Sequence, residues 1–88
     1  MITTKLYFLH NFAKNMNKKD LQVHIGKKIK QLREEKDISQ VDLAYACNFE
    51  KSNMSRIETG NTCPNVFTIQ KIAEKLEIPV YKIFEEIV

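Results

Sequence analysis

The chain has 88 residues, of which 43% are hydrophobic, and it contains only two glycines and two prolines. This length suits one domain with a modest core, and the composition excludes a disordered chain. The net charge is only +3, but residues 1–36 hold nine Lys/Arg against three Asp/Glu. A basic first half suits a polyanionic partner, although solvated lysines on a helix give the same pattern.

Neither cysteine, Cys47 or Cys63, lies in a C-x-x-C spacing, and no cluster of histidines accompanies them. We therefore expect reduced thiols in a cytoplasmic protein, with no disulfide framework, no metal site and no cofactor. No apolar run approaches the ~18–20 residues of a membrane span. The N-terminal stretch MITTKLYFLHNF lacks a cleavage site of the signal-peptide kind.

Residues 1–19 differ from the rest of the chain and are predicted to form an N-terminal extension to a domain of residues 20–88. Leu6 to Leu9 are all apolar, and their periodicity does not separate a strand from a short helix. Met16 would make a natural second start. Two hypotheses stand for residues 1–15: a dispensable extension, or an arm that packs on the domain or on a second copy.

The first helix of the domain is predicted from an apolar face. Its members recur at spacings of four, four and three: Leu21, Ile25, Ile29 and Leu32. Asp20 is the predicted N-cap, and Lys36-Asp37 the predicted end. A second helix, Gln40 to Cys47, follows Ser39, which begins a Ser-x-x-Asp sequence similar to a capping box.

Three further helices complete an all-α, five-helix prediction. Lys51 to Thr59 forms the third, and Gly60 can adopt the positive φ of its C-terminal cap. Asn65 is predicted to cap the fourth. The inner side of that helix is expected to carry Phe67, Ile69, Ile72, Ala73 and Leu76. After Pro79, residues 80–87 are predicted as a last short helix.

The second and third helices, joined by a short turn, form a helix-turn-helix candidate. Ala44 is small enough for close helix approach, and Asn48 tolerates a left-handed turn conformation. The wedge between the two helices is predicted to be Leu43, Phe49, Met54 and Ile57. The rest of the third helix then faces outward with hydrogen-bonding groups at Lys51, Ser52, Ser55 and Arg56. Serines cost helix propensity, so contact with base edges in a DNA major groove explains them better than an ordinary surface does.

These motifs resemble the repressor–Cro-like, or XRE-type, helix-turn-helix family over about residues 25–85. The resemblance includes LRE at 32–34, SQ-x-x-LA at 39–44, S-x-I-E-x-G at 55–60 and P-x-x-x-x-I-x-x-IA-x-x-L at 64–76. It implies a five-helix repressor-like bundle and a sequence-specific regulator, a repressor or restriction–modification controller, that binds double-stranded DNA as a homodimer on a two-fold operator.

The resemblance also implies roles for individual residues. Gln40 would contact phosphate and buttress the recognition helix, and Asn61 would contact the DNA backbone. Lys51, Ser52 and Arg56 fall where the family reads bases, and Ser55 where it touches bases or backbone. Arg33 and Glu58 fall where the family has a structural ion pair. Arg56 is the first choice for a base contact, since Arg commonly pairs with guanine.

The chain departs from the family pattern at two positions. Asn48 replaces the usual turn glycine, and Glu50 stands where Ser or Thr is the preferred cap. The charge of Glu50 suits a helix N-terminus but would repel a phosphate. It could instead accept a hydrogen bond from cytosine N4.

No nucleophile–base set, phosphate loop or metal-ligand cluster indicates an enzyme. The predicted dimer surface is the C-terminal helix and tail, with Phe84, Ile87 and Val88, although Phe84 could equally be core. The rival hypothesis is an antitoxin or protein-interaction module that uses the same fold to bind a protein partner. An interaction face should expose aliphatic or aromatic side chains, whereas the third helix carries Lys, Ser and Arg.

Overall fold

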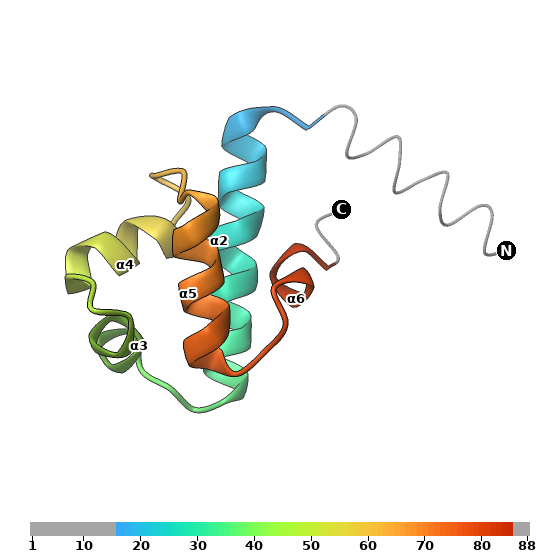
Figure 1. Ribbon diagram of the computed structural model, residues 1–88. Helices are drawn as coiled ribbons and strands as arrows, with labels where there is room; N and C mark the ends of the chain where they lie inside the picture. Colours follow the sequence, from blue (N-terminus) through green and yellow to red (C-terminus); the bar gives the residue numbers. More distant parts are fainter. Residues whose placement is uncertain (1–15, 86–88) are drawn as a thin grey trace, which may run out of the picture.

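The computed structural model describes residues 16–85, and Figure 1 shows their arrangement. Five helices follow one another in this range: α2 (Lys18–Glu35), α3 (Gln40–Cys47), α4 (Lys51–Glu58), α5 (Val66–Leu76) and α6 (Tyr81–Phe84). Between residues 16 and 85 no residue is in a strand, so the all-α prediction is confirmed. The alternatives for residues 1–15 concern a part of the chain outside the described residues.

The long helix α2 is the central element of the fold. In Figure 1, α3 and α4 lie on one side of it and α6 on the other, while α5 runs alongside it in front. Helix α2 packs against all four of the other helices. The shared core consists of Ile25, Ile29, Leu32, Leu43, Ala44, Cys47, Met54, Ile57, Ile69, Ile72, Ala73, Leu76 and Ile83.

Three helices begin with a side-chain cap. The Ser39 Oγ accepts a hydrogen bond from the Asp42 N–H at 3.0 Å, as the Ser-x-x-Asp pattern predicts. The Asn65 Oδ1 accepts from the Thr68 N–H at 2.8 Å, which confirms the predicted cap of α5. Each cap satisfies a backbone donor that the helix leaves unpaired, and contributes about 1 kcal/mol.

The predicted start of α2 is wrong. Asn17, not Asp20, is the N-cap, and its side chain accepts from the Asp20 N–H at 2.8 Å. Asp20 instead lies in the first turn, where its charge favours the helix N-terminus. The helix therefore begins at Lys18, about one turn before the start that a cap at Asp20 predicts.

Two other predictions also need correction. Phe67 was expected on the inner side of α5, but its side chain is 70% exposed. It lies in the first turn of α5, before Ile69, which is the first buried residue of that helix. The last helix ends at Phe84, because Glu85 is already extended at φ −65° and ψ 139°. Ile87 and Val88 lie outside the described residues.

Among the described helices, none is both long enough and apolar enough to cross a lipid bilayer.

Gly26 allows α2 and α4 to approach closely. A Cβ at this position would meet the Ile57 carbonyl oxygen and would lie 2.6 Å from that of Glu58. Both atoms are backbone, so they cannot rotate away as the end of a side chain could. The absence of a side chain at residue 26 therefore sets the separation of the two helices.

We expect Gly26→Ala to lower the free energy of unfolding by about 1–3 kcal/mol, the usual cost of overpacking. This loss would come despite the gain of up to about 1 kcal/mol that Ala brings at an open helix position. Urea denaturation followed by circular dichroism measures it, with Gln31→Ala at an exposed position of α2 as the control. A Gly26→Ala protein as stable as wild type would contradict the close contact.

Candidate nucleic-acid interface

Helices α3 and α4 are joined by a tight turn of residues 48–50. Asn48 is left-handed at φ 62° and ψ 36°, as the sequence predicts, and the Phe49 N–H donates to the Ala44 carbonyl at 2.8 Å. That bond closes the C-terminus of α3 and reverses the chain. Glu50 then caps α4 through its backbone carbonyl, to which the Asn53 N–H donates at 3.0 Å.

The predicted wedge between α3 and α4 is confirmed. Leu43, Met54 and Ile57 are buried, and Phe49 packs half-buried against the core. Ala44 is buried as well, at the contact where a larger side chain would separate the helices. Apolar contacts therefore hold this side of α4 against α3 and the core.

The opposite side of α4 is polar and accessible. Ser52 and Arg56 are exposed and lie four residues apart, with Ser55 half-buried beside them. At about 100° per residue these three side chains form one stripe. Lys51 is exposed at the first position of α4. Four of the six residues predicted to contact DNA thus share α4, and they supply two cations and two hydroxyls.

Glu58 connects the interface to the rest of the domain. Its carboxylate accepts from the Arg33 Nε at 2.7 Å, from the Arg33 Nη2 at 3.0 Å and from the Gln40 Nε2 at 3.0 Å. The Arg33 Nη1 donates to the Ile38 carbonyl at 2.8 Å. Arg33 and Glu58 are only 7% and 5% exposed, so solvent screens this pair weakly. One carboxylate therefore links α2, α3 and α4.

The electrostatics of the ion pair follow from this geometry. The bidentate hydrogen bond to Glu58 is the main cause that raises the pKa of Arg33 above its ordinary value, while burial acts in the opposite direction. Arg33 is thus fully charged at any physiological pH.

A second set of contacts lies beyond the C-terminus of α4. Gly60 has the predicted positive φ, 78°, and its carbonyl accepts from the Lys19 Nζ at 2.7 Å and from the Gln22 Nε2 at 3.1 Å. Asn61, the predicted backbone contact, is exposed and accepts from the same Lys19 Nζ at 3.3 Å. Sequence reasoning missed Lys19 and Gln22, because no spacing relates them to residues about forty positions later.

The described residues contain no group of three potential metal ligands. Cys47 is fully buried, and this burial raises the pKa of its thiol, which keeps it neutral and unreactive. Cys63 is an exposed residue of the loop between α4 and α5. The exposed side chains of the site supply hydrogen-bond donors and positive charge.

Comparisons with known proteins agree with this geometry. The helix-turn-helix family model HTH_3 matches residues 29–83, which is more than half of the chain. The control protein C.MunI of Mycoplasma sp is 32% identical over 69 residues, covering 77% of this chain and 93% of its own length. The immunity repressor of Bacillus phage phi105 is 34% identical over 62 residues, and the match covers 70% of this chain but only 43% of the repressor.

Solved structures show the same arrangement of helices. The restriction–modification controller C.AhdI from Aeromonas hydrophila superposes with a TM-score of 0.70 at 28% identity. The superposition covers 72% of this chain and 96% of C.AhdI.

We expect Arg33→Ala to lower the free energy of unfolding by about 3–5 kcal/mol, because it leaves the buried Glu58 carboxylate without its charged partner. Thermal melting measures the loss, and Lys30→Ala, an exposed α2 lysine, is the control. An Arg33→Ala protein that melts like wild type and yet loses DNA binding would assign Arg33 to the interface instead of the scaffold.

Proposed function

The chain belongs to the HTH_3 helix-turn-helix family, the repressor–Cro-like (XRE-type) group, and from this premise we propose that it binds a two-fold operator as a homodimer. Membership makes it a DNA-binding transcriptional regulator. The proposal concerns the finer points: the residues that contact DNA, the type of regulator and the dimer. The relatives named above are all regulators or controllers, and the proposal involves no catalysis.

The polar stripe of α4 is the observation that carries the proposal. A helix can lie in a major groove only if its outer face offers groups that match the base edges. Arg56 is exposed in the last turn of α4 and can donate two hydrogen bonds to guanine O6 and N7. Ser52 and Ser55 can donate or accept. Lys51 can serve a base or a phosphate.

Gln40 and Asn61 would fix the protein on the DNA backbone. One of the two amide N–H groups of Gln40 donates to Glu58, and among residues 16–85 the second is left for a phosphate. This single side chain would then connect the DNA backbone to the ion pair that orients α4. Phosphate contacts of this kind set register and carry little sequence information.

The names of two relatives favour a controller. C.MunI is a control protein, and C.AhdI is a restriction–modification controller protein. We therefore propose a regulator of the restriction–modification controller type.

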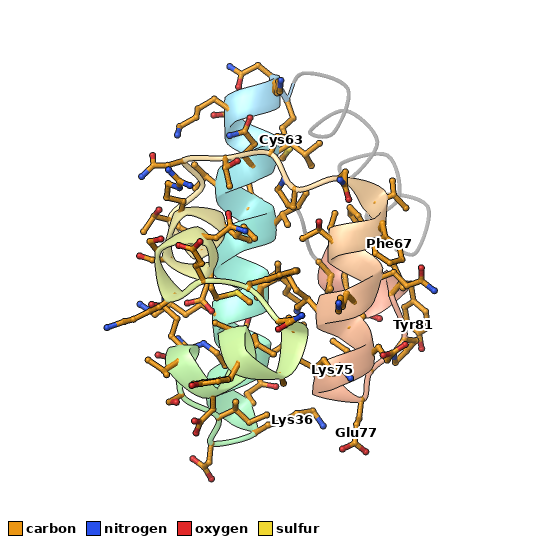
Figure 2. All side chains as sticks on the ribbon, turned by 60° about the vertical axis from the view of Figure 1, so that its left-hand side comes forward. Lys36, Cys63, Phe67, Lys75, Glu77 and Tyr81 are labelled. Carbon is orange, nitrogen blue, oxygen red and sulfur yellow. The ribbon has the colours of Figure 1, made fainter. Side chains whose placement is uncertain are left out.

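Two copies of the chain would dimerise through one surface, the α5–α6 flank, which is formed by α5, α6 and the residue just before α6. Exposed apolar side chains gather there: Val66, Phe67, Val80, Tyr81 and Phe84. Figure 2 shows Phe67 and Tyr81 on this same flank. A lone module buries only about 600–1,000 Å² on DNA, so a dimer on half-sites about 34 Å apart gains the affinity that one copy lacks.

The operator test is a selection from a random duplex pool near physiological salt. We expect wild type to enrich a two-fold site, and Arg56→Ala to relax the preference at one base pair per half-site, a loss of about 1–3 kcal/mol of discrimination. Asn61→Ala is the contrasting variant, because a lost phosphate contact should weaken all sequences equally. If wild type enriches no sequence and shows only steep salt-sensitive binding, the alternative of an antitoxin or protein-interaction module replaces this proposal.

The dimer test compares two exposed aromatic positions. We expect Phe67→Asp to convert the protein to a monomer in light scattering at micromolar concentration, because it buries a charge in the proposed interface. Tyr45→Asp on α3 is the matched control: Tyr45 is 81% exposed but belongs to the helix-turn-helix instead of the α5–α6 flank. Equal oligomeric states for the two variants would contradict the proposed surface.

A further inference from the structure

The first turn of α2 closes over the turn that follows the recognition helix. The Lys19 Nζ lies 2.7 Å from the Gly60 carbonyl oxygen and 3.3 Å from the Asn61 Oδ1. Gln22 adds a second donor to the Gly60 carbonyl at 3.1 Å. Two side chains of α2 therefore converge on one backbone oxygen at the end of the helix-turn-helix.

Within residues 16–85, the hydrogen bonds of this corner leave two donors over. A lysine ammonium has three N–H groups, and the two contacts of Lys19 use two of them. The Asn61 amide has two N–H groups, and one donates to the Thr59 Oγ1 at 3.1 Å. Both residues are exposed, and their side chains are in contact through the bond from the Lys19 Nζ to the Asn61 Oδ1.

Lys19 also fixes the orientation of Asn61. An ammonium can only donate, so it holds the amide oxygen of Asn61 toward α2, while the amide nitrogen donates to the Thr59 Oγ1. The backbone N–H of Asn61 donates to the Arg56 carbonyl at 2.9 Å. This bond attaches the corner to the last turn of α4. The donors are thus held in place relative to Arg56.

The charge around the corner favours an anion. Lys18 and Lys19 are two cations against the single carboxylate of Asp20 in the same turn. The positive end of the 18-residue α2 dipole points to the same place. The nearest carboxylate on α4, Glu58, is buried and paired with Arg33.

We propose that Lys19 and Asn61 together bind one phosphate of the DNA backbone, beside the bases that Arg56 contacts. This inference rests on the proposed function and adds to it a contact from outside the helix-turn-helix. Lys19 supplies the charge, Asn61 supplies a neutral donor, and the Gly60 carbonyl keeps the lysine side chain extended before DNA arrives.

The test measures binding of Lys19→Gln and wild type to a random-sequence 30-base-pair duplex at several salt concentrations. Loss of one phosphate contact should reduce the slope of log K against log salt by about 0.9. Between 50 and 200 mM salt, wild type would then lose about three- to fourfold more affinity than Lys19→Gln. Lys30→Gln is the matched control, because it removes the same charge from α2 about 16 Å further along the helix and should leave the slope unchanged.

The outcomes separate this inference from the proposed function. If wild type binds no duplex at all, both are overturned. If wild type binds and Lys19→Gln has the wild-type slope, only the phosphate contact is overturned. A Lys19→Gln protein with a lower melting temperature and an unchanged slope also overturns it, because Lys19 would then only stabilise Gly60.

Two further variants confirm or overturn a shared phosphate. Lys19→Arg keeps the charge and should keep the wild-type slope. The double variant Lys19→Gln/Asn61→Ala should lose less affinity than the product of the two single losses, since both side chains bind the same group. Fully independent losses would mean that the two residues do not share a phosphate.

Discussion

The buried ion pair of Arg33 and Glu58 is the interaction on which the orientation of α4 depends. Two charges removed from water lose hydration, and only good geometry with further hydrogen bonds compensates for that loss. Here the Glu58 carboxylate receives three donors, and the Arg33 guanidinium also donates to the Ile38 carbonyl. The pair thus joins the end of α4 to α2, to the start of α3 and to the connection between them. An apolar contact of the same area would not fix the rotation of α4 about its own axis, because hydrophobic packing is not directional.

Close approach of α2 and α4 makes that geometry possible. Gly26 lets the Ile57 and Glu58 carbonyls lie against α2. Arg33 lies about two turns after Gly26 on α2, and from there its side chain reaches the Glu58 carboxylate. The inner side of α4 supplies both the apolar contacts and the ion pair that hold the helix in the fold. The side chains of its outer side are therefore not needed to hold it there. That division explains how a helix with few strong helix formers is stable within the fold while Ser52, Ser55 and Arg56 remain accessible.

Much of this fold could be predicted from the sequence, because the helices have strong local signals. Apolar periodicity marks α2 and α5, while Ser39, Asn48, Gly60 and Asn65 mark helix ends by their own chemistry. Sequence patterns gave the wrong prediction where packing against another part of the fold decides the helix start or the burial of a side chain. Asn17 and Asp20 are equally good caps. Phe67 fits the inner spacing of α5, although none of residues 16–85 covers its side chain. Glu77 is left-handed at φ 58°, a conformation that its residue type does not indicate. The contacts of Lys19 and Gln22 with Gly60 depend on the packing of α2 across α4, which no sequence pattern encodes.

Helix α2 also connects the two surfaces that the proposed dimer would use: the polar stripe of α4 for DNA and the α5–α6 flank for the second copy. It packs against α4 on one side and against α6 on the other, and its 18 residues span about 27 Å. In a two-fold dimer joined through the α5–α6 flank, the separation of the two recognition helices must match the spacing of successive major grooves. Rotation of α4 is fixed by Glu58, and its distance from the flank is fixed by α2. The corner formed by Lys19 and Asn61 lies at the end of that same helix. A rigid α2 would therefore set both half-site spacing and the position of the phosphate contact, so that these two properties would change together if the helix were bent or shortened.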